Sequence, residues 1–387
     1  PLSGAPRESY RPFKVSGEPD VDFPMHCDGL VTIGGTGIGI ANLIVGTAKG
    51  FIQRAEACRR LLRVLDFLEK ADRFHGVWPH WLWGPTAKVQ PFSALDDGAD
   101  LPESCFVFQS LLIARAFFDS KDDSIEADIR ERASRLWEAA EFNHFVKDGR
   151  LMWHWSPNHD FNLGLGVVGF NEAQICYLLG VSHPKNPISP EVYVSGWANS
   201  NPDNYRAALE SAKAPLFWTH LSYYGFDPRH GDQFCESYFE MLSNRTQAHI
   251  DYAAENPKEC PGYGACQLWG QSACFTKAGY EICSPSNDTG VIAPFVTCSA
   301  YPFKPTESLA AMKYMYRTYA ADLWGAAGFK DSIAPREGFV VPLYVALDQA
   351  TVTPMIENGR TGLLWSLFMS SDEAKRIIDS LQLRGRL

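Results

Sequence analysis

The chain has 387 residues, and its 35 basic and 45 acidic side chains give a formal net charge of −10. An acidic chain without a Lys/Arg-rich run excludes nucleic acid or an anionic membrane surface as its main partner. Its 24 Phe, 15 Tyr and 11 Trp residues instead favour a neutral, hydroxyl-rich ligand such as a sugar. With 45% apolar residues, the chain contains enough material for a sizeable core.

The first residues, 1–27, are expected to form an extended, Pro-rich segment. They contain neither a basic n-region nor an apolar h-region, so the protein is either intracellular or has lost a signal peptide. The weakly charged stretch 29–48 is too rich in Gly and Thr for a membrane span. Within it, Ile40 stands where a GxGxxG dinucleotide motif requires its third glycine, so close packing at a helix start is the better interpretation.

Helical periodicity recurs along the rest of the chain. Helices are predicted over Ile40–Lys70, Glu103–Phe118, Ile125–Phe145, Glu172–Leu179, Asp232–Asn256, Thr306–Leu323, Thr361–Met369 and Asp372–Leu381. Loops rich in Gly, Pro, Trp and His lie between them, and no linker divides the chain. We therefore expect residues 28–387 to form one all-α domain, an (α/α)6 barrel (a toroid) with long aromatic loops lining a cleft at one end.

The most suggestive segment carries four carboxylates, Asp96, Asp97, Asp100 and Glu103, just before an apolar helix. Asp100 and Glu103 have the spacing of a capping box, in which Asp100 accepts from the first-turn amides and Glu103 reaches back. Capping does not explain Asp96 and Asp97. Crowded carboxylates raise one another's pKa and can share a proton, which suits acid–base chemistry near neutral pH.

Two further polar groups follow. Glu172, downstream of Trp153-His154-Trp155, is expected to open a helix, where it could complement the helix dipole. It could equally be a general acid, because aromatic surroundings desolvate a carboxyl group and raise its pKa. Asp348, Glu357 and Arg360 form the third group, which is either a solvated helix start or a sugar-binding set.

The cysteines and histidines do not predict a metal centre. Cys260, Cys266, Cys274 and Cys283 crowd a Gly-rich stretch, but their gaps do not match zinc sites. They could form one or two disulfides or remain thiols. The histidine spacings assemble no obvious metal triad, so we predict no metal and no cofactor.

Taken together, several strings resemble the glucoamylase-like family of glycoside hydrolases, in particular glycoside hydrolase family 144, the β-1,2-glucanases. They include Phe74-His-Gly-Val-Trp-Pro-His80, Asp96-Asp-Gly-Ala-Asp-Leu-Pro-Glu-Ser104, Phe170-Asn-Glu172 and Met355-Ile-Glu-Asn-Gly-Arg-Thr-Gly-Leu-Leu-Trp365. They occur in the family's order across roughly residues 28–385. The resemblance implies an (α/α)6 barrel, no required metal, and hydrolysis of β-1,2-glucan with inversion of configuration.

The resemblance also implies a set of site residues. Glu172 would be the general acid. The base would be Asp100, or Asp96 acting through a water chain. Glu103 would tune the pKa values of its neighbours or bind sugar hydroxyls. Inversion requires the acid and base carboxyl groups to stand about 6.5–9.5 Å apart. Candidate substrate contacts are Trp78, His80, Trp83, His154, Trp155, Asn171, Trp197, Trp218, His220, Tyr263, Trp269, Asp348, Glu357 and Arg360.

The leading hypothesis is an endo-β-1,2-glucanase that acts on β-1,2-glucan or its oligosaccharides. An exo-acting enzyme that releases sophorose is the nearest alternative, and a non-catalytic sugar-binding barrel is the alternative from another class. A transglycosylase is disfavoured, as is a lyase acting on acidic polysaccharides, which would need a basic cleft. A polysaccharide substrate leads us to expect a periplasmic or extracellular location.

Overall fold

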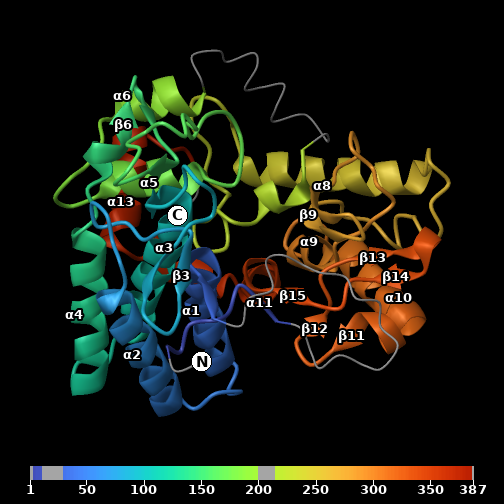
Figure 1. The fold of residues 1–387 in the computed structure, drawn as a ribbon, viewed down its shortest axis with the longest axis horizontal. Helices are drawn as coiled ribbons and strands as arrows, with labels where there is room; N and C mark the ends of the chain where they lie inside the picture. The colour runs from blue at the N-terminus through green and yellow to red at the C-terminus, as the bar shows by residue number, and fades with distance from the viewer. Residues whose placement is uncertain (1–2, 11–28, 199–213, 386–387) are drawn as a thin grey trace.

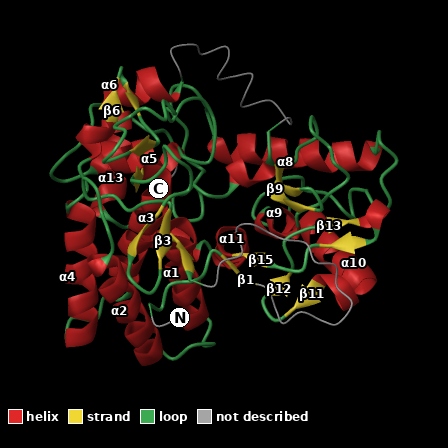
Figure 2. Cartoon of the chain, in the orientation of Figure 1, coloured by secondary structure: helices red, strands yellow, loops and turns green. Residues whose placement is uncertain are grey.

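The computed structural model describes residues 3–10, 29–198 and 214–385, and this part of the chain is mostly helical (Figure 2). The helices are α1 (Ile33–Ala48), α2 (Arg54–Lys70), α3 (Leu101–Phe117), α4 (Ser124–Glu138), α5 (Gln174–Ser182), α6 (Pro190–Val192), α8 (Tyr238–Glu255), α9 (Pro294–Ser299), α10 (Pro305–Leu323), α11 (Ala346–Thr361), α12 (Leu363–Met369) and α13 (Asp372–Leu381). Short helical turns are η1 (Phe142–Phe145), η2 (Tyr193–Trp197), η3 (Leu216–Thr219) and η4 (Pro335–Glu337).

The strands are short and pair antiparallel in small sheets of two or three. They are β1 (Ser9–Tyr10), β2 (Leu30–Thr32), β3 (Trp81–Trp83), β4 (Lys88–Gln90), β5 (Ala99–Asp100), β6 (Val146–Lys147), β7 (Arg150–Leu151), β8 (His154–Trp155), β9 (Ala273–Thr276), β10 (Gly279–Ile282), β11 (Trp324–Gly325), β12 (Gly328–Phe329), β13 (Ile333–Ala334), β14 (Phe339–Val340) and β15 (Tyr344–Val345). They tie loops together rather than forming a separate layer.

The predicted helices are confirmed in kind, although several of their ends shift by a few residues and the short helices α6 and α9 were not predicted. The stretch predicted over Ile40–Lys70 forms two helices, because the chain turns at Gly50, whose φ of 75° ends the helical path. Helix α11 was not expected, since Pro354 and nearby Gly and Thr residues interrupt its periodicity. Its packing against α1 and α9 supplies the stability that local propensity lacks.

Figure 1 shows α1 to α5 and α13 on one side of the molecule, α8 to α10 with β9 to β14 on the other, and α11 between them. The glycine-rich stretch at the start of α1 packs directly on α3. A Cβ atom on Gly37 would lie 2.5 Å from the backbone nitrogen of Val107, so only glycine permits this approach. The stretch is therefore a packing surface, as predicted, and not a dinucleotide loop.

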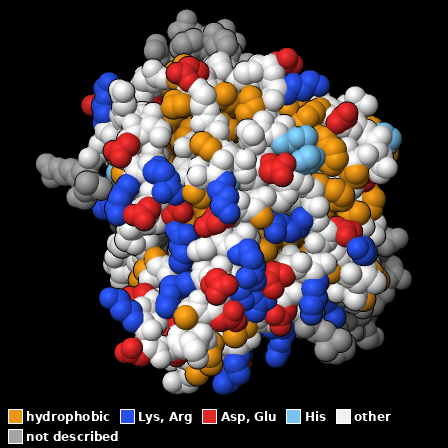
Figure 3. Space-filling view, turned by 90° about the vertical axis from the view of Figure 1, so that its left-hand side faces the viewer, with side chains coloured by type: hydrophobic (Ala, Val, Ile, Leu, Met, Phe, Trp, Pro, Cys, Tyr) orange, Lys and Arg blue, Asp and Glu red, His pale blue; other side chains and the backbone are white. Residues whose placement is uncertain are grey.

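Ion pairs join α2 to α4 on the outer surface. Arg54 Nε lies 2.6 Å from Glu126 Oε1, and Arg132 pairs with Asp66 and Glu69. Figure 3 shows basic and acidic side chains interspersed on this face. Because charges of both signs alternate there, this face carries no large basic patch.

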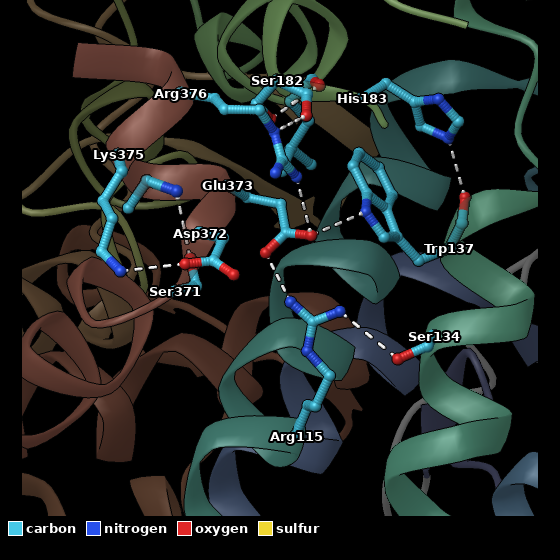
Figure 4. Close-up of polar contacts among 12 residues, drawn as sticks. Arg115, Ser134, Trp137, Ser182, His183, Ser371, Asp372, Glu373, Lys375 and Arg376 are labelled. Atoms are coloured by element: carbon cyan, nitrogen blue, oxygen red, sulfur yellow. Dashed lines mark hydrogen bonds and ion pairs between the residues drawn. The ribbon is translucent and has the colours of Figure 1, made fainter. Parts of the chain in front are cut away.

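Helix α13 is anchored by the buried carboxylate of Glu373 (Figure 4). It accepts hydrogen bonds from Arg115 of α3 and from Trp137 Nε1 of α4, the latter at 3.2 Å, and Arg376 lies 3.1 Å away. One carboxylate thus joins three helices.

We expect Glu373→Ala to lower the free energy of unfolding by ~3 kcal/mol, because it leaves a partly buried Arg115 without its partner. Thermal unfolding should show a Tm lower by several degrees, while kinetic constants measured below that Tm stay unchanged. Glu131→Ala, an exposed change on α4, is the control. Equal Tm values for the two variants would contradict a role for Glu373 as an anchor.

The N-terminal strand β1 pairs with β15, and Ala346 N–H donates to the carbonyl of Glu8 at 2.8 Å. This pairing carries Glu8 into the interior. Most of the segment predicted to be extended, residues 11–27, lies outside the described residues, and the single domain over 28–387 stays a prediction. In the described ranges, no helix has both the length and the apolar character needed to cross a bilayer.

Candidate functional site

Strand pairing brings the two segments singled out in the sequence into one site. Strand β5 pairs with β8 so that Asp100 lies opposite His154 and Ala99 opposite Trp155. Asp100 is also the N-cap of α3, and its Oδ1 accepts from Glu103 N–H at 3.0 Å. This half of the predicted capping box is confirmed.

The other half of the capping box is wrong. Glu103 does not reach back to Asp100, whose N–H donates to the carbonyl of Trp78. Instead, Glu103 Oε2 accepts from Gly34 N–H at 2.6 Å, at the N-terminus of α1. Burial, opposed by the charge on His80, raises the pKa of Glu103 to about 8. Glu103 makes this tertiary contact instead of reaching back to Asp100, because the first N–H groups of α1 have no partner within their own helix.

His80 is the cation of the site. Its Nδ1 lies 3.1 Å from Asp100 Oδ2. Burial would lower the pKa of His80, but the surrounding carboxylates, Glu103 first, outweigh it and raise that pKa to about 10. Both oxygens of Asp100 therefore accept hydrogen bonds, one from the helix and one from an imidazolium.

Asp96 and His154 form a second pair. His154 Nε2 accepts from Gly98 N–H at 3.1 Å, so that ring nitrogen carries no proton. Asp96 Oδ1 lies 3.2 Å from the same nitrogen, and this contact is favourable only when Asp96 is protonated. Burial and the neighbouring Asp100 carboxylate raise the pKa of Asp96 to about 7, in agreement with this geometry.

Asp97 has a different role from Asp96. Its carboxylate accepts from Ser156 Oγ at 2.5 Å and from Asn158 Nδ2 at 2.7 Å. These hydrogen bonds hold the pKa of Asp97 below its usual value despite partial burial. Asp97 thus orders the loop after β8 and does not hold a proton.

Glu172 stands on a turn two residues before α5, not within the helix as predicted. Asn171 Oδ1 accepts from Ala173 N–H at 2.8 Å, and Ser222 Oγ donates to the Glu172 carbonyl at 2.5 Å. The turn is therefore fixed while the carboxyl group is left half-buried. Burial, with a smaller contribution from the charge on Asp100, raises the pKa of Glu172 to about 7.

Sequence reasoning missed three residues of this region. Glu8 arrives on the N-terminal segment, Asp331 precedes β13, and both are buried beside Asp348. Phe92 is 46% exposed and its ring centroid lies 4.3 Å from that of His80, so it offers an exposed flat surface beside His80. No motif marked Glu8 and Asp331, because they come from segments far apart in the chain, whereas Phe92 stands in the carboxylate-rich segment itself but was not singled out.

Several predicted sugar contacts are wrong because they belong to the core. Trp78, Trp197, Trp269 and His220 are fully buried. The Trp78 indole N–H donates to the carbonyl of Leu68, and an aromatic ring enclosed on all sides cannot stack on a sugar. Tyr263 is nearly buried and donates to Asp288, so it too is held within the structure.

Trp83, Trp155 and Trp218 retain exposed surface, and their role as subsite walls stays a prediction.

The members of the third predicted polar group lie at opposite ends of α11. Asp348 lies in its first turn, whereas Glu357 and Arg360 lie about 13 Å or more along the axis at its other end. Glu357 there pairs with Lys49 Nζ at 2.7 Å, so neither Glu357 nor Arg360 joins the carboxylate site.

The four clustered cysteines, Cys260, Cys266, Cys274 and Cys283, are free thiols in the structure. Of the two alternatives left open by their spacing, the structure has the thiols. Of the four, Cys274 interacts electrostatically with Asp331 and Asp348.

Ligand atoms of His80, Asp96 and Asp100 lie within 4.8 Å of one another, the spacing of a possible metal site. The donor set does not suit a metal, because an imidazolium has no free lone pair. We expect EDTA treatment followed by dialysis to leave activity within about twofold of the untreated protein. An activity that EDTA abolishes and one divalent cation restores would contradict this.

The fold and site define a mostly helical protein with a carboxylate-rich site under aromatic rings. Residues 165–372 match the glycoamylase family model, more than half of the chain. The chain therefore belongs to this glucoamylase-like family.

Two relatives with solved structures are similar over nearly the whole chain. An endo-β-1,2-glucanase from Chitinophaga pinensis, in complex with sophorotriose and glucose, shares 36% identity with a TM-score of 0.92, covering 100% of this chain and 94% of that one. A β-1,2-glucanase from Parabacteroides distasonis shares 35% identity with a TM-score of 0.87, covering 92% and 55%.

An exo β-1,2-glucooligosaccharide sophorohydrolase from Parabacteroides distasonis is 36% identical over 384 residues, 91% of this chain and 53% of that protein. The chain spans about half the length of this curated relative.

Proposed function

We propose that the protein is a glycoside hydrolase of family 144, an (α/α)6 barrel that cleaves β-1,2-glucan as an inverting endo-β-1,2-glucanase. The observation that carries this proposal is the meeting of Glu172, Asp100, Asp96 and Glu103 in one site beside exposed aromatic rings. The β-1,2-glucanase names of relatives about 36% identical support the substrate.

In the proposed mechanism Glu172 protonates the leaving glycosidic oxygen. Its half-buried position keeps a proton on the carboxyl group near neutral pH, as a general acid requires. We assign the activation of the attacking water to Asp100, whose carboxylate is fully buried and is oriented by hydrogen bonds from His80 and from the α3 backbone. Asp96 acting through a water chain is the alternative base.

The charge of the site selects a neutral ligand. Seven carboxyl groups, Glu8, Asp96, Asp100, Glu103, Glu172, Asp331 and Asp348, are linked by electrostatic interactions, with His80 as their imidazolium. His80 is the one cation among these groups and already pairs with Asp100, so little positive charge is left to hold the carboxylates of an acidic polysaccharide, which argues against a lyase on uronic acids. A purely sugar-binding protein would not need buried acids with pKa values near neutrality.

The second candidate is an exo enzyme that releases sophorose, and the name of the Parabacteroides distasonis relative favours it. An exo enzyme of this kind differs from an endo enzyme in having blocked minus-side subsites. We propose a periplasmic or extracellular location, no cofactor, and β-1,2-glucan or its oligosaccharides as the partner.

We expect kcat/KM to fall as pH rises through about 7, by about tenfold per pH unit, because Glu172 then loses the proton it must donate. Initial rates on a soluble oligosaccharide between pH 5 and pH 9 test this. A profile that is flat from pH 6 to pH 9 would remove Glu172 from the role of acid.

The proposed function is tested by incubating the purified protein with linear β-1,2-glucan and following the reaction by proton NMR. Inverting endo-hydrolysis produces the α-anomer first and a mixture of short oligomers. Disaccharide alone would select the exo enzyme. No cleavage of β-1,2-glucan would refute the proposal, and β-1,3- and β-1,4-glucans serve as comparison substrates.

A further inference from the structure

Asp331 and Asp348 form a buried carboxyl pair that the proposed acid and base do not include. Asp331 precedes β13, where its Oδ2 accepts from Phe275 N–H at 2.8 Å. Asp348 stands in the first turn of α11. In the sequence, Asp331 precedes β15 and Asp348 follows it. Each of the two side chains is more than nine-tenths buried.

The remaining oxygens of this pair point to a shared proton. Asp331 Oδ1 and Asp348 Oδ2 are buried and have no donor among the described residues. The two carboxyl groups are nevertheless near enough for each to shift the pKa of the other. Ionised carboxylate oxygens only accept, so a hydrogen bond between them requires a proton on one of the two groups.

The surroundings also favour a protonated pair. The strongest electrostatic neighbours of Asp348, apart from Asp331, are the carboxylates of Glu8 on the N-terminal segment and Glu103 on α3. Tyr280 of β10 and Cys274 of β9 face the pair as neutral groups. Burial and these acidic neighbours raise the pKa of Asp348 well above its usual value, and burial raises that of Asp331 to about 7.

We propose that Asp331 is a positioning residue that keeps a proton on Asp348 at neutral pH, so that Asp348 meets the glucan as a neutral hydrogen-bonding group and not as a base. Asp331 Oδ1 accepts the shared proton, and Asp348 Oδ1 is left to accept a hydrogen bond from a sugar hydroxyl. This role rests on the proposed function, and it leaves the base to Asp100 or Asp96.

The shared proton can be tested without any activity assay. A carboxyl group whose pKa is raised by folding stabilises the fold fully below its unfolded pKa of about 4, and this contribution is lost as pH rises through its folded pKa. The asparagine in Asp331→Asn cannot ionise, so this variant does not lose that stability as pH rises. Its amide oxygen can still accept the hydrogen bond from Phe275 N–H. We expect it to raise the Tm at pH 8 by several degrees relative to the unaltered protein, and to change the Tm at pH 5 much less.

The matched control for the Tm measurement is Asp372→Asn, at an exposed position where Lys375 holds the pKa below its usual value. This variant should show no gain in Tm at pH 8. If the Tm difference between Asp331→Asn and the unaltered protein is the same at pH 5 and pH 8, the shared proton is refuted.

The role of Asp348 is tested by Asp348→Asn, whose amide reproduces a neutral carboxyl group. We expect kcat/KM on β-1,2-glucan to fall by less than about tenfold, whereas loss of a general base costs about 100- to 10,000-fold. In Asp331→Asn, the rise of KM with pH should begin at lower pH, because Asp348 then ionises more easily. A thousandfold loss in a well-folded Asp348→Asn would make Asp348 a base and overturn the proposal.

The two proposals fail in different ways. If the unaltered protein does not cleave β-1,2-glucan, the proposed function falls, while the Tm comparison still decides whether Asp331 and Asp348 share a proton. If cleavage is normal but the Tm comparison shows no pH dependence, only the role of Asp331 falls.

Discussion

Glu172→Gln is expected to lower kcat on β-1,2-glucan by about 100- to 10,000-fold, the usual range for loss of a general acid. Glutamine fits the same turn, because Asn171 and Ser222 hold the backbone and not the carboxyl group. It cannot, however, give a proton to the glycosidic oxygen. Initial rates measured at pH 6, with Tm measured in parallel, test this expectation.

A change of leaving group separates loss of the acid from general damage. An aryl β-sophoroside with an acidic phenol leaves without protonation, so Glu172→Gln should lose much less activity on it than on glucan. Glu131→Gln, at an exposed position on α4, is the control and should behave as the unaltered protein. Equal losses on both substrates would show that Glu172 is not the acid.

Asp100→Asn is expected to lower kcat by about 1,000-fold or more, with similar losses for glucan and for an aryl sophoroside, because a base acts on water and not on the leaving group. Asparagine is also a good N-cap, so α3 should keep its start, but loss of the charge that pairs with His80 should lower the Tm. The measurement is kcat on both substrates together with Tm.

Asp96→Asn is the matched comparison for Asp100→Asn. If Asp96 activates water through a chain, Asp96→Asn shows the larger loss, and azide should rescue whichever variant lacks the base. Retention of activity within tenfold by both variants would exclude Asp96 and Asp100 from the base role.

Local sequence was a good guide where one segment supplies its own partners. The helix predicted over Asp372–Leu381 is observed with the same bounds, because an N-cap serine and a strongly one-sided apolar pattern specify it. Asp100 caps α3 for the same reason: its acceptor and the first-turn amides are three residues apart. The grouping of Asp96, Asp100 and Glu172 also needed only the resemblance of short strings to a known family.

Other features depend on segments that meet only after folding. The contact between Glu103 and Gly34 spans 69 residues, and the pairing of Asp331 with Asp348 depends on how folding brings the start of α11 to the segment before β13. The sequence does not distinguish a buried tryptophan, such as Trp78, from an exposed one, such as Trp83.

The composition and motifs of this chain therefore specify a helical class, an acidic aromatic site and the residues around which it forms. The three-dimensional packing selects which carboxyl groups are buried together and which rings face solvent. The physical reason is that pKa values and sugar contacts depend on desolvation and on neighbours distant in sequence, and these are set by the packing of whole helices.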